Sequence, residues 1–163
     1  MLRSIKVRAV ALAGMTVLVT ASAALASATP TVPAASGTSG KKDLKAKPAS
    51  IMYTGDGSAF LAGAKKSRDK TKSLTWTSWT ASSGKGSGYN WLNSCKPDCA
   101  SGTFHSYPVT LKVWRPKTVA GQLIFTRMTV TYTSKMPPGA RKKIQIWKVR
   151  YHHKAYVWKF PPQ

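Results

Sequence analysis

The sequence predicts an all-β fold: a single small antiparallel domain, either a sandwich or a partly open barrel, with six to eight strands. Three observations support this prediction. Thr, Val, Trp and Tyr are frequent throughout residues 51–163, Gly and Pro interrupt the chain at short intervals, and no long stretch has the 3.6-residue periodicity of a helix. The two layouts, sandwich and partly open barrel, share this pattern, so both stay open at this point.

Residues 1–28 have the pattern of a signal peptide. Arg3, Lys6 and Arg8 precede an apolar run over residues 9–25, and Ala26-Ser27-Ala28 supplies a small-residue cleavage site. The run is rich in Ala, Ser, Thr and Gly, whereas a membrane span needs about 20 predominantly apolar residues. We therefore expect cleavage near Ala28, export by the general secretory route, and a secreted or cell-wall-associated protein. We expect no transmembrane segment in the mature chain.

Residues 29–50 are predicted to be a disordered tether. The segment from Thr29 to Gly40 consists of Thr, Pro, Val, Ala, Ser and Gly, and Lys41, Lys42, Lys45 and Lys47 follow. Such a composition buries too little apolar surface to offset the entropy of ordering. A flexible spacer and a polybasic arm that binds anionic surfaces are both open interpretations.

The β domain is predicted to span residues 51–163, and its first strands are short. Ile51-Met52-Tyr53 precedes the turn Gly55-Asp56-Gly57. Leu74 and Trp76 alternate with Thr75 and Thr77, but Trp79 falls out of phase, which indicates a β-bulge or a strand end.

The middle of the domain has the clearest strand pattern. Apolar residues alternate with polar ones over residues 107–113, and Arg115-Pro116 is expected to end this strand because proline cannot donate to a ladder. The same alternation returns over residues 124–132. A loop containing Gly121 separates the two runs, which predicts an antiparallel pair.

The last segment predicts a hairpin with a defined register. Pairing residues 144–151 with residues 156–160 across a His-His-Lys-Ala tip places three pairs on one face: Tyr151 with Tyr156, Val149 with Trp158, and Trp147 with Phe160. Lys148, Arg150 and Lys159 then lie on the opposite face. The hairpin therefore has an apolar side and a cationic side.

The charge is strongly one-sided. The chain has a formal net charge of +22, and residues 29–163 keep 23 of its 26 Lys and Arg residues against four Asp, a net charge of +19. Such a balance favours polyanionic partners: anionic cell-wall polymers, acidic polysaccharide, or nucleic acid without specificity. The candidate polyanion-binding residues are Lys41, Lys42, Lys45, Lys47, Arg141, Lys142, Lys143, Lys148, Arg150 and Lys159.

The two cysteines, Cys95 and Cys99, are separated by Lys96-Pro97-Asp98. In an oxidising compartment this spacing predicts a local disulfide. Redox catalysis normally uses two intervening residues, and a zinc site would need further ligands close by.

Catalysis finds little support in the residue types present. There is no Glu, and the four acids, Asp43, Asp56, Asp69 and Asp98, form no evident pair. Asp56 is expected to cap its own turn. His152 and His153 are neighbours, so on a strand their side chains point to opposite faces. We expect no catalytic residue, no metal and no cofactor. The alternative is an unrecognised small secreted hydrolase or nuclease, whose site would use His105 or Asp56.

Six tryptophans are many for one small domain. Trp76, Trp147 and Trp158 are expected to lie in the core, where large aromatic side chains supply much of the buried area. Trp91 and Trp114 are candidate aromatic ligand contacts, and covering a sheet rim is the other role open to them. Exposed Trp would suit a carbohydrate-binding module, which is the alternative function.

An ordered set of motifs resembles small secreted proteins of actinobacteria. The motifs are Leu74-Thr-Trp-Thr-Ser-Trp79, then Asn93-Ser-Cys95-Lys-Pro-Asp-Cys99-Ala-Ser-Gly102, then Phe125-Thr-Arg-Met-Thr-Val130. The resemblance covers roughly residues 51–133. It implies export and supports the domain limits, and it implies no activity or ligand. We expect a secreted, non-enzymatic β module that associates with polyanionic cell-envelope or extracellular polymers.

Overall fold

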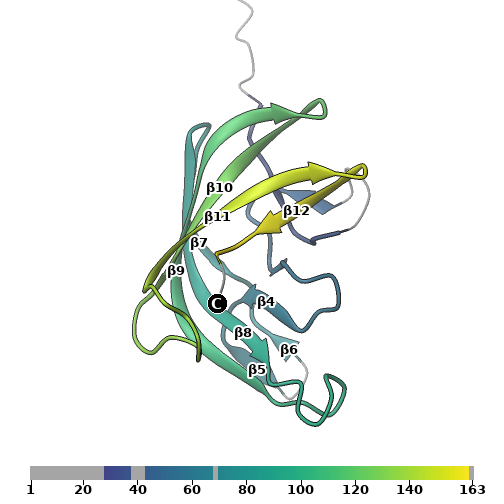
Figure 1. The fold of residues 1–163 in the computed structure, drawn as a ribbon. Helices are drawn as coiled ribbons and strands as arrows, with labels where there is room; N and C mark the ends of the chain where they lie inside the picture. The colour runs from purple at the N-terminus through teal and green to yellow at the C-terminus, as the bar shows by residue number, and fades with distance from the viewer. Residues whose placement is uncertain (1–27, 38–42, 68–69, 162–163) are drawn as a thin grey trace, which may run out of the picture.

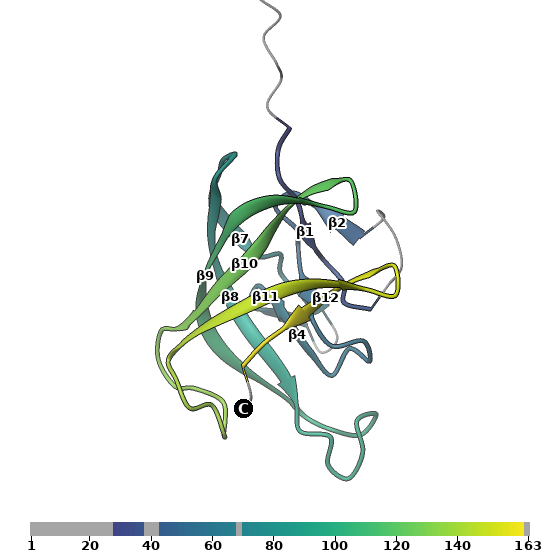
Figure 2. The same cartoon turned by 45° about the horizontal axis from the view of Figure 1, so that its top comes forward.

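The computed structural model describes residues 28–37, 43–67 and 70–161 and confirms the all-β prediction. Its main element is an eight-stranded sheet in which the strands follow the order β12-β11-β10-β9-β8-β4-β3, while β7 pairs with β8. Figures 1 and 2 show this sheet curling into a partly open barrel. Residues 1–27 of the predicted signal peptide lie outside the described residues.

The strands of the main sheet are antiparallel. Their bounds are β3 Ile51–Met52, β4 Ala59–Ala62, β7 Thr75–Trp79, β8 Ser83–Asn93, β9 Phe104–Val119, β10 Gln122–Tyr132, β11 Ile144–His152 and β12 Ala155–Lys159. Two small sheets accompany it, one of β1 Val32–Pro33 and β2 Leu44–Lys45, the other of β5 Lys65–Ser67 and β6 Lys70–Thr71.

The prediction that Arg115-Pro116 ends a strand is wrong, because β9 continues to Val119. Pairing of β9 with β8 stops at Trp114, so Pro116 lies where that edge of β9 has no partner strand among the described residues. A proline is tolerated at such an edge because its missing N–H is not needed there. Arg115 has a φ of 59°, and its carbonyl accepts a hydrogen bond from the Thr126 hydroxyl at 2.9 Å.

The two long hairpins close through two-residue turns. Ala120 and Gly121 connect β9 to β10 with φ of 48° and 73°, and His153 and Lys154 connect β11 to β12 with φ of 47° and 60°. Positive φ at both central residues matches the right-handed twist of the flanking strands. The predicted antiparallel pair around Gly121 is therefore confirmed.

The C-terminal hairpin has the predicted register. Val149 pairs with Trp158, and Tyr151 pairs with Tyr156, whose rings lie 4.9 Å apart. β12 ends at Lys159, so Phe160 lies just beyond the strand, but its ring still packs 5.5 Å from that of Trp147. The apolar side of this hairpin faces the core.

The phase break at Trp79 is a β-bulge between Trp76 and Ser78 in the β7–β8 pairing. The bulge turns both indoles inward over glycines of β8. A Cβ at Gly84 would lie 2.6 Å from the Trp79 ring, and a Cβ at Gly86 would lie 2.8 Å from the Trp76 ring. The inner face of β8 therefore has room for these rings only because it carries glycines.

Residues 29–50 are not a disordered tether where the structure describes them. Residues 30–37, here called the N-terminal strap, lie between the two edge strands of the main sheet. Met52 of β3 donates its N–H to Ala34 O at 2.8 Å, and Trp158 of β12 donates its N–H to Ser36 Oγ at 3.0 Å. Val32 is fully buried. Apolar burial and the pairing of both sheet edges offset the ordering entropy that the composition alone leaves uncompensated.

Tryptophan side chains hold this N-terminal region to the barrel. The indole N–H groups of Trp79, Trp158 and Trp76 donate to the carbonyls of Pro30, Pro33 and Pro48, at 2.9, 3.0 and 2.9 Å. Each bond satisfies a polar group that would be costly to bury unpaired. The folded unit therefore begins about twenty residues before the predicted boundary at residue 51.

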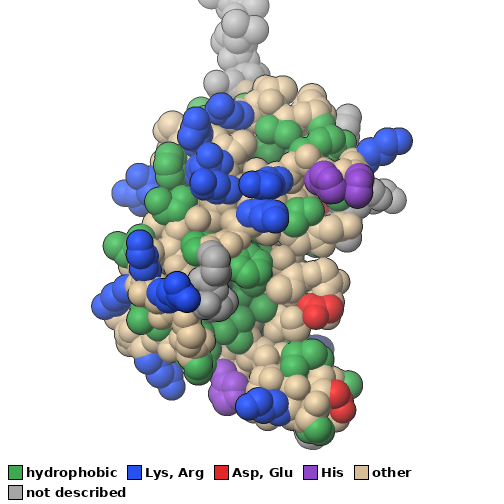
Figure 3. Space-filling view, in the orientation of Figure 1, with side chains coloured by type: hydrophobic (Ala, Val, Ile, Leu, Met, Phe, Trp, Pro, Cys, Tyr) green, Lys and Arg blue, Asp and Glu red, His purple; other side chains and the backbone are tan. Residues whose placement is uncertain are grey.

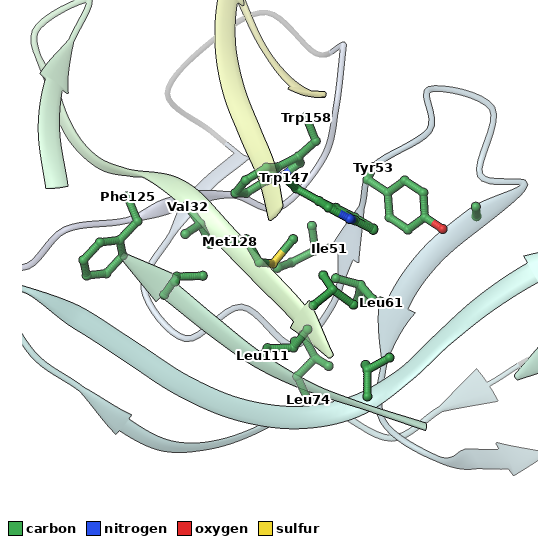
Figure 4. Packing of buried hydrophobic residues seen from close by; sticks show 14 of the residues in the cluster. Val32, Ile51, Tyr53, Leu61, Leu74, Leu111, Phe125, Met128, Trp147 and Trp158 are labelled. Carbon is green, nitrogen blue, oxygen red and sulfur yellow. The ribbon is translucent and has the colours of Figure 1, made fainter. Parts of the chain in front are cut away.

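The core lies inside the curled sheet (Figure 4). Trp147 and Trp158 are almost fully buried, as predicted, and Trp76 is half-buried and packs against the cluster. The Tyr53 ring lies edge-on to Trp147 at 4.5 Å.

A buried polar chain crosses the barrel interior. Tyr53 donates its hydroxyl to Asn90 Oδ1 at 2.8 Å, and Asn90 Nδ2 donates to the Tyr132 hydroxyl at 2.8 Å. Burial raises the pKa of both tyrosines. This hydrogen-bond chain links the residue that follows β3 to β8 and β10 and favours one register among these strands.

Replacing Asn90 by leucine is expected to lower the free energy of unfolding by about 2–3 kcal/mol, because the Tyr53 hydroxyl loses its acceptor while staying buried. Urea unfolding followed by tryptophan fluorescence measures this change. Gln122→Leu makes the same amide-to-leucine change at a half-exposed hairpin end and is expected to change stability by less than about 0.5 kcal/mol. Equal effects of the two substitutions would contradict a structural role for the Tyr53–Asn90–Tyr132 hydrogen-bond chain.

Candidate functional site

The loop between β8 and β9 contains the predicted disulfide. The sulfurs of Cys95 and Cys99 lie 2.02 Å apart. Asn93 donates its side-chain amide to Cys99 O at 2.7 Å and accepts the Cys95 N–H at 2.9 Å. Hydrogen bonds from Ser101, first of all from its backbone N–H, hold the pKa of Asp98 below its usual value. The side chains of Asn93 and Asp98 thus stabilise the conformation of this loop.

Cys95→Ser combined with Cys99→Ser is expected to lower the free energy of unfolding by about 2 kcal/mol, since the bond closes a very short loop. Urea unfolding with and without a reductant measures the effect. The double variant is its own control because the reductant should not change it. A wild-type unfolding midpoint that is insensitive to reductant would contradict this prediction.

Asp56, His152 and His153, which were considered for catalysis, have local contacts. Asp56 accepts hydrogen bonds from the backbone N–H and hydroxyl of Ser58, at 3.0 and 2.7 Å, and these bonds lower its pKa. Asp56 thus caps its turn as predicted. The expectation that His152 and His153 point to opposite faces is wrong: His153 lies in the β11–β12 turn with a φ of 47°, and its ring lies 3.9 Å from that of His152. Over the described residues, no group of three His, Cys or Asp side chains could hold a metal ion.

Cations collect on the outer face of the main sheet, the side turned away from the core. Lys85 of β8 pairs directly with Lys112 of β9. In the next row, Arg127 of β10 pairs with Lys148 of β11, and Lys148 pairs with Lys159 of β12. We call these five residues the cationic face. Figure 3 shows Lys and Arg side chains gathered over the β9–β11 side of the molecule, whereas the acidic side chains in view lie at its other edge.

The cationic face contains like charges directly opposite one another. Directly paired side chains have Cβ atoms about 5 Å apart, and like charges at that spacing destabilise a sheet. The two rows contain no acidic residue: Trp114 and Ser83 continue the second row, and Thr129 and Ile146 continue the first. A sheet that retains this repulsion has a charge arrangement suited to an anionic partner.

The predicted cations lie in three places. Lys148, Arg150 and Lys159 are exposed on the outer side of β11 and β12, as expected. Arg141, Lys142 and Lys143 are exposed in the connection before β11, while Lys45 and Lys47 are exposed near β2. Lys41 and Lys42 lie outside the described residues.

Lys85, Lys112 and Arg127 were not among the predicted binding residues. Their neighbours in the sequence could have shown that these cations point outward. Gly84 and Gly86 flank Lys85, Leu111 and Val113 flank Lys112, and Met128 follows Arg127, and all of these neighbours face inward. Residues between inward-facing neighbours on a strand point outward. The alternation along one strand does not reveal the register between strands, and this register aligns the cations in rows.

A shallow groove of about 340 Å³ lies on the outer face across β7–β10. Its floor contains a grid of side chains from three strands: Ser87, Thr110 and Thr131 in one row, and Lys85, Lys112 and Thr129 in the next. Among the residues that the structure describes, no acidic side chain lines it. Cation and hydroxyl groups are therefore brought together from segments up to about 46 residues apart in the sequence.

The two candidate tryptophans have different surroundings. Trp91 is only 6% exposed, and its indole donates to Gly63 O at 3.1 Å while its ring stacks 6.3 Å from that of Phe60. The prediction that Trp91 is an exposed ligand contact is wrong, because β4 and the Gly63 backbone cover its side chain. Trp114 is half-buried on the outer face, opposite Arg127, and donates to Thr129 Oγ1 at 3.1 Å.

In comparisons with known proteins, no family model, no curated protein and no solved structure matches this chain. Within residues 28–37, 43–67 and 70–161, no helical segment has the length and apolar character needed to cross a membrane. The fold and the outer face define a class: a partly open β-barrel with a cationic external surface.

Proposed function

We propose that this chain is an exported, non-enzymatic β module that binds polyanionic polymers of the cell envelope or the extracellular space on its outer face. The signal-peptide pattern of residues 1–28 supports export. The net charge of +19 in residues 29–163 supports an anionic partner.

The direct opposition of Lys85 with Lys112, and of Lys148 with both Arg127 and Lys159, is the observation that carries this proposal. An anionic polymer lying across the strands, between the two rows, would contact both rows and relieve their repulsion. Its contacts would come from positions on ordered strands, so the backbone would lose little conformational entropy on binding.

Retention on isolated bacterial cell walls and on dextran sulfate beads tests the proposal. We expect retention to be lost between about 0.1 M and 1 M salt, where the screening length falls from about 10 Å to about 3 Å. Neutral dextran beads are the matched control and should retain nothing. Retention that is equal at both salt concentrations would refute the electrostatic proposal.

Trp114 supports carbohydrate binding as a second candidate function, since its half-buried ring lies beside the hydroxyl-lined groove. Aromatic rings are effective stacking platforms for other flat or apolar faces. Binding to a neutral polysaccharide that persists in high salt and disappears with Trp114→Ala would favour this candidate over the first.

A further inference from the structure

We infer that the groove over β8–β10 is a specific site for an ester-linked tetrahedral oxyanion, a sulfate or phosphate ester carried on a saccharide chain. This inference rests on the proposed function and names the group that the outer face recognises. The groove contains two opposed lysines, Lys85 and Lys112, and four hydroxyl side chains that can donate. A single anion between the two ammonium groups would remove the repulsion that their direct pairing creates.

The hydroxyl groups in the groove have hydrogens available to donate, which favours a ligand that has several hydrogen-bond acceptors. Within the described chain, the hydroxyls of Ser87, Thr110 and Thr131 have no hydrogen-bond partner. Thr129 Oγ1 accepts from the Trp114 indole at 3.1 Å, so its own hydrogen is free to donate. The Thr77 hydroxyl, at the β7 side, donates instead to Lys85 O at 3.2 Å. The grid therefore presents donors from four hydroxyls and two ammonium groups.

The number of donors distinguishes classes of anion. A carboxylate has two oxygens, whereas a sulfate or phosphate monoester presents three terminal oxygens around a tetrahedral centre. A donor grid built from three adjacent strands, which are about 4.8 Å apart, surrounds a three-oxygen group better than a planar two-oxygen group. Hydroxyls left over can contact the sugar that carries the ester.

The test compares polymers of matched charge density with different anionic groups, using the predicted mature chain, residues 29–163. Dextran sulfate and phosphorylated dextran carry the esters, and polygalacturonate carries carboxylates. We expect the esters to bind about 10-fold more tightly than the carboxylate polymer at equal salt. Tighter binding of one ester over the other identifies the source of the group. Binding of phosphorylated dextran should also strengthen as pH rises through about 6, where its second ionisation lies, and binding of dextran sulfate should not.

Thr110→Val combined with Thr131→Val removes two donors while keeping charge, shape and strand propensity. We expect this variant to bind polygalacturonate as the wild type does and to lose most of the roughly 10-fold preference for esters. Thr118→Val is the control, since Thr118 is exposed on the same strand and outside the groove. Urea unfolding verifies that each variant is folded.

Two negative outcomes have different meanings. If esters and carboxylates bind equally and with the same salt dependence, the groove is not specific and the inference fails, while the proposed function stands. If no polyanion is retained in a salt-dependent way, the proposed function fails and the inference fails with it.

Discussion

A chain that begins at Ile51 is expected to unfold at a far lower urea concentration than a chain that begins at Thr29. The shorter chain lacks the N-terminal strap, which joins the β3 and β12 edges through Ala34 and Ser36. It also leaves the indoles of Trp76, Trp79 and Trp158 without their proline carbonyl acceptors. Lost apolar burial and lost hydrogen bonds together amount to about 5 kcal/mol or more, comparable to the whole stability of a small domain.

A point substitution isolates the contribution of strap packing. Val32→Asp places a charge at a fully buried site and is expected to cost about 3–5 kcal/mol. Ala46→Asp makes the same change in charge at an exposed position of the neighbouring segment and should cost less than about 0.5 kcal/mol.

Urea unfolding followed by tryptophan fluorescence measures both effects, since three of the reporting indoles contact this region. Equal unfolding midpoints for the chains beginning at Thr29 and Ile51 would return the domain boundary to residue 51. Equal effects of the two aspartate substitutions would exclude Val32 from the core.

Lys112→Glu combined with Lys148→Glu is expected to weaken binding to dextran sulfate by about 100-fold or more. Each cation near an anionic surface contributes about 1 kcal/mol, and each reversal also adds a repulsion, so two reversals exceed the 2.8 kcal/mol or so that this factor requires. The two positions belong to different rows of the cationic face and lie on β9 and β11.

Stability should change in the opposite direction. Lys112→Glu faces Lys85, and Lys148→Glu faces both Arg127 and Lys159, so repulsive pairs become attractive ones. Each converted pair is expected to stabilise the sheet by a few tenths of a kcal/mol, up to about 1 kcal/mol. A rise in unfolding midpoint together with a loss of binding is the signature of a surface maintained for binding rather than stability.

Lys70→Glu combined with Lys96→Glu is the matched control, because it changes the net charge equally at exposed positions outside the cationic face. It is expected to weaken binding by less than about 3-fold, through the general field alone. If both double variants weaken binding to the same degree, the partner responds to net charge, and the rows on the outer face have no special role.

Much of the fold could be predicted because its signals are local. Alternation of apolar and polar residues defined the strands around Val113 and Met128, and the aromatic pairing of Tyr151 with Tyr156 set the last hairpin register. The prediction that proline ends the strand failed at Pro116, where the absence of β8 as a neighbour allows the strand to continue. That absence is a property of the sheet and not of the segment.

The candidate site was predicted in part for the same reason. Lys148, Arg150 and Lys159 share a hairpin, so their common face follows from sequence spacing. Lys85, Lys112 and Arg127 lie on three strands, and their alignment depends on the β8–β9–β10 register. Trp91 illustrates the converse, since the Phe60 ring and the Gly63 carbonyl that cover it come from about thirty residues away.

By itself, the sequence determined the all-β class, the hairpin turns, the local disulfide spacing and the excess of positive charge, because each depends on residues close together in the chain. Only the tertiary structure decided that residues 30–37 close the barrel, that Trp91 is covered, and which cations stand opposite one another. Those features depend on contacts between distant segments. The free energy of such contacts is the sum of apolar burial and hydrogen bonds supplied by both partners, so neither segment alone reveals it.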